Sequence, residues 1–99
     1  MALRVKVSAR AASQIRKAAE WWAENRPAAS GAVRIDIGEA LAMLAQQPGF
    51  GIAYEGVRTQ GVRRLLVGRI RYFIYYRVTT EALEVLAVWH VSRGKQPAL

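Results

Sequence analysis

Hydrophobic positions along the chain change from alternation to a helical period and then back to alternation. At the start, Leu3, Val5 and Val7 alternate with two basic residues. This pattern is typical of a short strand buried on one side only. It predicts a strand over Leu3–Val7.

Two helices are predicted after this strand. Ser8 can cap a helix over Ala9–Asn25, because its hydroxyl accepts a free amide hydrogen of the first turn. Apolar residues recur in this segment at spacings of three and four, which gives one apolar stripe. The helix should end before Pro27, since the residue preceding a proline is disfavoured from helical geometry. A second helix over Ala28–Gln47 follows, and the short connection favours an antiparallel helical hairpin.

The period changes to two residues after the second helix. The segment Ile52–Gln60 has no clear period and is expected to be a loop or an irregular edge. A tight turn is expected at Gly68–Arg69. Three strands are predicted over Val62–Val67, Ile70–Val78 and Leu83–Val91, and their short connections favour an antiparallel meander.

Both faces of these strands are partly apolar. In the last strand, strict alternation puts one set of residues on one face, namely Leu83, Val85, Ala87 and Trp89, and a second set on the other, namely Glu84, Leu86, Val88 and His90. One face must pack on the helices and the other must be half open. The predicted fold is α+β with the order βααβββ. Its N-terminal strand and helical hairpin pack on one face of a small antiparallel sheet, in a single domain over residues 1–99.

Composition adds a strong charge to this picture. The chain is 53% hydrophobic, which suffices for a core, and its formal net charge is +8. An excess of positive charge of this size indicates that the chain binds an acidic protein or nucleic acid. The absence of cysteine and the single histidine argue against disulfides and metal sites, so no metal or other cofactor is expected. Without a signal peptide or a membrane span, the protein is expected in the cytoplasm.

The positive charge is concentrated in one stretch. Six arginines and no acidic residue lie between Arg58 and Val78. Arg63 and Arg64 are neighbours in a predicted strand, so their side chains point to opposite faces. An unpaired guanidinium would be costly on the helix-covered side. We therefore predict that one of the two meets a carboxylate or carbonyl groups within the fold, while the other faces the open side.

Four segments resemble bacterial toxins of the ParE/RelE superfamily. They are P-A-A-S at 27–30, L-A-Q-Q-P-G-F-G at 44–51, G-V-R-R-L-L-V-G-R-I-R-Y-F-I-Y-Y-R-V at 61–78 and V-W-H-V-S-R at 88–93. The resemblance implies the toxin of a two-gene module, neutralised by a small ParD-like antitoxin with an acidic segment. The ParE-like branch of the superfamily is associated with poisoning of DNA gyrase, and the RelE-like branch cleaves mRNA on the ribosome.

Two departures favour the ParE-like branch. Val91 follows His90, where some nuclease members have a tyrosine, and lysine occurs at only three positions. We therefore expect a toxin that acts by binding and has no catalytic residue. Because Trp21 and Trp22 are adjacent on a helix, one is expected in the core and the other as an exposed anchor. The candidate residues for binding the target or the antitoxin are Arg58, Arg63, Arg64, Arg71, His90, Arg93, Trp21 and Trp22.

The alternative is a RelE-like, metal-independent mRNA endonuclease. That chemistry needs a base, an acid and cations around one phosphate. Glu55 is the candidate base, His90 the acid, and Arg64 and Arg71 the cations. A general nucleic-acid module would show a recognition signature, and an enzyme for small metabolites would show a phosphate loop or paired carboxylates; the sequence has none of these.

Overall fold

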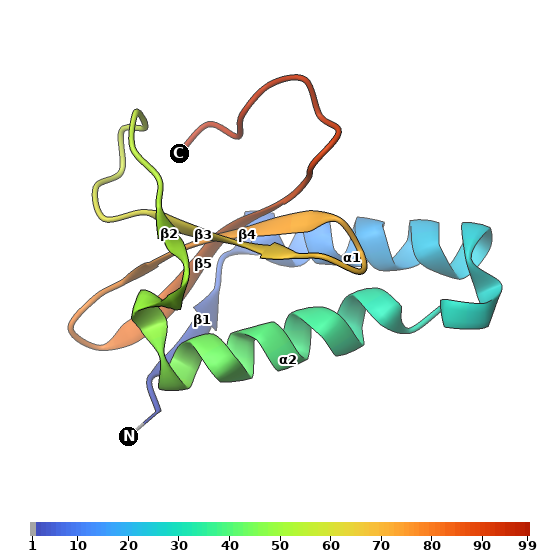
Figure 1. Cartoon of the computed structure of the whole chain (residues 1–99), viewed down its shortest axis with the longest axis horizontal. Coiled ribbons are helices and arrows are strands. Elements are labelled where there is room, and N and C mark those ends of the chain that lie inside the picture. Colours follow the sequence, from blue (N-terminus) through green and yellow to red (C-terminus); the bar gives the residue numbers. More distant parts are fainter. Residues whose placement is uncertain (1) are drawn as a thin grey trace.

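A computed structural model describes residues 2–99 and shows an α+β fold, as predicted (Figure 1). Helices α1 and α2 pack against a five-stranded sheet. In chain order the elements are β1 (Arg4–Val7), α1 (Ala9–Asn25), η1 (Pro27–Ala29), α2 (Ala32–Gln46), η2 (Pro48–Phe50), β2 (Ile52–Ala53), β3 (Arg63–Val67), β4 (Tyr72–Val78) and β5 (Ala82–His90). Within residues 2–99, no helix is both long enough and apolar enough to cross a membrane.

The sheet is mixed, with the strand order β1-β5-β4-β3-β2. Strands β2 to β5 are antiparallel neighbours, whereas β1 pairs in parallel with β5, with Val5 opposite Leu83. The N-terminal strand therefore lies at the edge of the sheet, and the prediction that it packs on a face was wrong. A short connection requires the two strands that it joins to be antiparallel. Most of the chain lies between β1 and β5, so these two strands can pair in parallel.

Helix α1 begins and ends as predicted. Ser8 has an extended backbone, and its Oγ accepts a hydrogen bond of 3.0 Å from the amide of Ala11. The second helix begins at Ala32, four residues later than predicted. Residues Pro27–Ala29 instead form a separate 3-10 turn that helps reverse the chain between the two helices.

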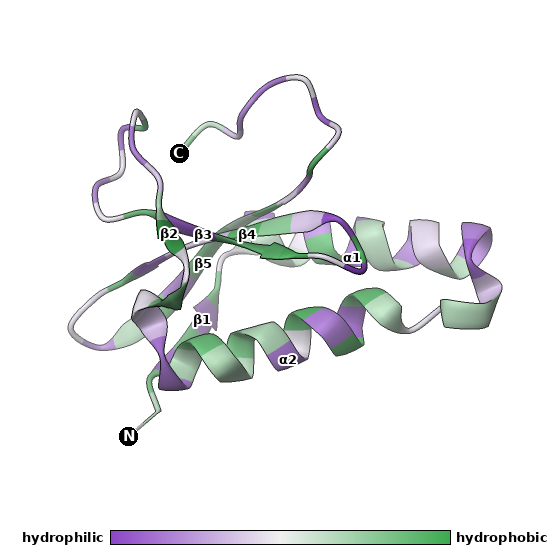
Figure 2. Cartoon of the chain, in the orientation of Figure 1, coloured by the Kyte–Doolittle hydropathy of each residue, from purple (hydrophilic) through white to green (hydrophobic). Residues whose placement is uncertain are grey.

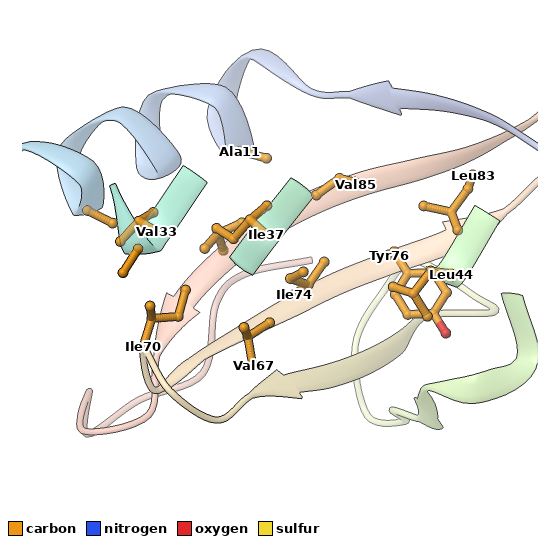
Figure 3. Close-up of a cluster of buried hydrophobic side chains, with 13 residues drawn as sticks. Ala11, Val33, Ile37, Leu44, Val67, Ile70, Ile74, Tyr76, Leu83 and Val85 are labelled. Atoms are coloured by element: carbon orange, nitrogen blue, oxygen red, sulfur yellow. The ribbon is translucent and has the colours of Figure 1, made fainter. Parts of the chain in front are cut away.

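The main core lies between the helices and one face of the sheet (Figure 3). Val33, Ile37 and Leu44 of α2 are at most 3% exposed and pack with Ile74 and Tyr76 of β4. Each large aliphatic side chain buried here contributes about 1.5–3 kcal/mol. Helix α1 contributes mainly small alanines, so its backbone lies close to the sheet.

A bulge in β5 changes the faces expected for this strand. Tyr75 pairs with Ala87 while Tyr76 pairs with Val85, which leaves Leu86 as an extra residue. Beyond the bulge, Val88 joins the helix-side core, whereas Ala87 and Trp89 lie in a second cluster. The prediction of strict alternation was therefore wrong, and His90 lies on the helix-covered face instead of opposite it.

The second face of the sheet is half open, as predicted. The loop before β3 and the C-terminal segment lie on this side, away from α2 (Figure 1), and cover a cluster that includes Val62, Tyr75 and Trp89. The Trp89 indole N–H donates to the carbonyl of Lys95 over 2.9 Å. The loop and the C-terminal segment do not cover the sheet near β2, where the side chain of Ile52 is 76% exposed.

Arg63 and Tyr76 hold the turn that leads into β2. The Tyr76 hydroxyl accepts a hydrogen bond from the Gly51 amide and donates one to the Pro48 carbonyl, over 2.9 and 2.7 Å. Arg63 donates to the carbonyls of Gly51 and Gly49 over 2.7 and 3.3 Å. This confirms that one arginine of the pair meets carbonyl groups within the fold.

The close approach of Tyr76 makes position 51 intolerant of a side chain. A Cβ at Gly51 would lie 2.4 Å from the Tyr76 hydroxyl oxygen. We expect Gly51→Ala to lower the free energy of unfolding by about 1–3 kcal/mol, because the buried ring must shift. Urea denaturation measures this loss. Gly49→Ala is the matched control, since a Cβ there meets no atom within 4 Å, and an equal loss in both variants would contradict the prediction.

Candidate functional site: a basic aromatic groove

Two adjoining pockets form a groove where α1 meets the ends of β4 and β5. Their volumes are about 360 and 330 Å³, and both are lined by Trp21, Tyr72 and His90. The first also contains Trp22, Arg26, Ile70, Arg71 and Ser92, and the second contains Gln14, Lys17, Ala18, Val88 and Arg93. We call this surface the groove.

The two tryptophans divide as predicted. Trp22 is partly buried and packs against the main core. Trp21 is 48% exposed, and its ring meets that of Trp22 edge to face at 6.4 Å between centroids. The guanidinium of Arg26 lies 5.5 Å from the centre of the Trp21 ring, within the range of a cation–π contact. The groove therefore presents one exposed indole beside a positive charge.

Tyr72 and His90 form the floor where the two pockets join. They are paired residues of β4 and β5, and their rings meet edge to face at 4.9 Å. Burial raises the pKa of the Tyr72 phenol, and the charge of Arg93 partly opposes this shift. His90 Nδ1 accepts a hydrogen bond of 3.1 Å from the Ser92 amide, so the ring proton belongs on Nε2. Nε2–H is then available as a donor to a partner.

The groove is positively charged throughout. Its cations are Lys17, Arg26, Arg71 and Arg93, and neither pocket is lined by an acidic residue. The ion pairs found within residues 2–99 lie outside the groove, for example Arg69–Asp36 and Arg77–Glu84. The cations of the groove have no part in these pairs. Arg26 and Arg93 lie instead over the rings of Trp21 and Trp89, at 5.5 and 4.0 Å from the ring centres, so no acidic side chain among the described residues neutralises their charge.

Arg71 has an unfavourable backbone conformation. The turn between β3 and β4 spans Gly68 to Arg71, so the predicted two-residue turn at Gly68–Arg69 was too short. Its length lets Ile70 enter the core, where it is 1% exposed. Among residues 2–99, Arg71 is the one non-glycine residue with a positive φ, at 62°. This hydrophilic turn lies beside α1 (Figure 2), which brings Arg71 to the tryptophans.

The remaining candidate residues lie outside the groove. Arg64 is on the second face, where its guanidinium lies 4.2 Å from the Phe73 ring centre and 4.9 Å from that of Tyr54. Arg58 is in the loop before β3 and lines a different pocket with Arg10. The structure thus brings Trp21, Trp22, Arg71, His90 and Arg93 together, and separates Arg58, Arg63 and Arg64 from them.

Sequence reasoning missed Lys17, Arg26 and Ser92 as members of the groove. The spacing of Lys17 and Trp21 offered one signal, since residues four apart lie on the same side of a helix. Arg26 and Ser92 lie just beyond the ends of α1 and β5, and only the fold brings them together.

The four residues of the nuclease alternative do not assemble. His90 and Arg71 line the groove, whereas Arg64 lies on the second face. Glu55 is exposed and follows Tyr54, which contacts Arg64 on that same second face. The sheet therefore separates the candidate acid from the candidate base. No group of three or more potential metal-ligating side chains occurs within the described part of the chain.

Comparison with known proteins places this chain in a family. The sequence model described as "ParE toxin of type II toxin-antitoxin system, parDE" matches residues 5–94. The chain belongs to this family. This ParE toxin also superposes on a chain of the structure described as "Chromosomal ParDE TA system from P. aeruginosa". The TM-score of 0.74 over 91% of this chain and 97% of that chain shows a shared fold, and the sequence identity is 23%. No curated protein matches the sequence.

The conformation of Arg71 gives a test of its role. A left-handed conformation costs a non-glycine residue about 1–2 kcal/mol, and glycine avoids most of this cost. We expect Arg71→Gly to raise the free energy of unfolding by about 0.5–1 kcal/mol, measured by urea denaturation. Arg71→Ala keeps the Cβ and should bring no gain. If both variants changed stability equally, backbone strain at this position would be refuted.

Proposed function

We propose that this ParE toxin inhibits growth by binding and poisoning DNA gyrase through the groove, and that an acidic antitoxin neutralises it. The observation that carries this proposal is the distribution of the candidate nuclease residues over two faces of the sheet. The groove retains cations and rings but has no carboxylate in its lining. This composition suits binding rather than acid–base cleavage.

Metal-independent cleavage of RNA makes strict geometric demands. A base must reach the attacking hydroxyl and an acid the leaving oxygen, each within about 3 Å of the same phosphodiester. Glu55 lies in the loop whose Tyr54 and Val57 pack on the second face, whereas His90 lines the groove on the helix-covered face, an arrangement that does not favour contact of both with one phosphate. The RelE-like alternative therefore lacks support in the arrangement of these side chains.

The charge of the chain supports an acidic antitoxin. Membership of a type II toxin–antitoxin family implies an antitoxin partner. With a net charge of +8, the toxin attracts an acidic segment over long range and accelerates its association. Arg58 and Arg64 place part of this charge on the second face, away from the groove. We propose that the antitoxin's acidic segment contacts this face.

Purified toxin and gyrase test the target directly. We expect the toxin to block negative supercoiling of plasmid DNA and to trap cleaved DNA, and its induction in cells to trigger a DNA-damage response. Glu55→Gln is the control for the alternative, because it removes the candidate base with little change in shape and should retain full inhibition. Rapid arrest of translation with cuts in mRNA, abolished by Glu55→Gln, would establish the nuclease instead.

Binding of the antitoxin should depend on salt. We expect Arg58→Glu to weaken binding of the acidic protein encoded next to the toxin by about 2–10-fold at low salt, with the effect fading near physiological ionic strength. Calorimetric titration at two salt concentrations measures this. Arg34→Glu, at the surface between α1 and α2, makes the same change in net charge and should have a smaller effect. Binding insensitive to salt and to Arg58→Glu would indicate that the tryptophan-bearing helix is the main antitoxin surface.

A further inference from the structure

We propose that the groove binds a short single-stranded segment of DNA, with an unpaired base stacked on Trp21 and the flanking phosphates held by Arg71 and the neighbouring cations. The inference deepens the proposed function, on which it rests for the source of the strand: a gyrase poison that acts at the cleaved DNA would contact an opened strand there. The groove itself indicates the class of ligand, through its rings, its charges and one strained residue.

The rings of the groove are arranged to receive a base. Trp21 is 48% exposed, although indoles in proteins of this size are usually covered. Tyr72 and His90 meet edge to face beside it, at the junction of the two pockets. Stacking of a base on an exposed aromatic ring contributes about 1–3 kcal/mol and is independent of sequence. A base on Trp21 would also lie within reach of the His90 Nε2–H donor.

The cations lie on both sides of these rings. Arg26 and Arg71 line one pocket, and Lys17 and Arg93 line the other. A strand running along the groove would place a phosphate in each pocket and a base at their junction. Alternation of phosphate and base along the strand thus matches the alternation of cations and rings along the groove. Arginine also suits phosphate because its planar guanidinium can donate two parallel hydrogen bonds.

Arg71 adds an independent argument. Its φ of 62° is a conformation that glycine would adopt at lower cost. Among residues 2–99 its side chain takes part in no ion pair, and it projects from an exposed turn into the groove. Its backbone is held in this conformation by two hydrogen bonds, from its amide to the Val67 carbonyl and from the Val91 amide to its carbonyl, over 2.9 and 3.0 Å. Strained residues held in this way cluster at ligand-binding positions, and here the turn fixes the point from which the guanidinium enters the groove.

Single-stranded DNA fits these features better than a duplex or an acidic peptide does. In a duplex the faces of the bases are stacked on each other, so Trp21 would have no base to receive. An acidic peptide would satisfy the cations but would leave the exposed indole and the ring junction unused. The geometry points to a ligand that carries both flat rings and closely spaced anions.

Fluorescence titration of the whole purified toxin tests the proposal. The probe is an oligothymidylate of about ten nucleotides, which covers a typical single-strand site. We expect binding that quenches tryptophan fluorescence and weakens with salt by about 0.7 in log K per unit of log salt for each phosphate contact. Trp21→Ala should weaken binding by about 5–150-fold, and Trp21→Phe should recover part of this loss. Arg71→Gly should weaken binding and reduce the salt slope by about 0.7.

Controls separate this site from general attraction to a basic protein. Arg34→Glu lowers the net charge as much as an Arg71→Glu variant but lies outside the groove, so it should bind the probe nearly as the unaltered chain does. A duplex of the same length and an oligoglutamate peptide should compete poorly. The proposal would be overturned if the duplex or the peptide competed as well as unlabelled single-stranded DNA. It would also be overturned if the toxin bound only an oligonucleotide with ribose in place of deoxyribose, or if the Trp21 variants bound the probe as tightly as the unaltered chain.

The two proposals can fail separately. Inhibition of gyrase without any binding of the oligonucleotide would overturn the DNA-binding site and leave the target in place. Binding of the oligonucleotide with the expected response to Trp21→Ala, but without inhibition of gyrase, would support the site and overturn the proposed target.

Discussion

Strand β5 has one more residue than β4 opposite Tyr75 and Tyr76, and this bulge determines the composition of both faces of the sheet. If Leu86 paired with Tyr75 in a regular ladder, Ala87 would take the place of Val88 opposite Ile74, and Trp89 would take the place of His90 opposite Tyr72. His90 would then lie on the second face, away from Tyr72. The charged and aromatic groove therefore depends on a local irregularity in a central strand. The bulge also sends Ala87 and Trp89 to the second cluster, so it helps to build two separate cores from one strand.

Much of the fold was predictable because its local signals are strong. Ser8 and the proline at 27 mark both ends of α1, and the structure has the helix over the predicted residues. A guanidinium on the helix-covered side needs hydrogen-bond partners, so one arginine of the pair was predicted to meet a carboxylate or carbonyl groups. Arg63 does so, with the carbonyls of Gly49 and Gly51. The bulge was not predictable, because Leu86, Ala87 and Val88 are all apolar. A register shift within an apolar run places no polar residue in the core, so the pattern of polar and apolar residues does not reveal it.

The groove was predictable only in part for a different reason. Its residues come from α1, from the β3–β4 turn and from the end of β5, and no spacing along the chain links these segments. The tryptophans were singled out because two neighbours on a helix cannot both enter the core, and Arg71 and His90 because they lie in the segments that resemble the toxin superfamily. The sequence could not single out Lys17 or Arg26, which resemble the other solvated bases of the chain. Nor could it separate Arg64 from Arg71, because a pattern of arginines does not specify the side of a sheet.

The C-terminal segment has a consequence for the order in which the molecule assembles. Arg10 bonds to the carbonyl of Ala98 and Thr59 to that of Leu99, contacts that join residues 88 and 40 positions apart. Closing such long loops carries an entropic cost, and contacts of this range form late in folding. The second cluster is also small, so it should open locally while the helix-side core stays intact. The toxin would then have a rigid half, which shapes the groove, and a softer half, which can adjust its surface to a partner during binding.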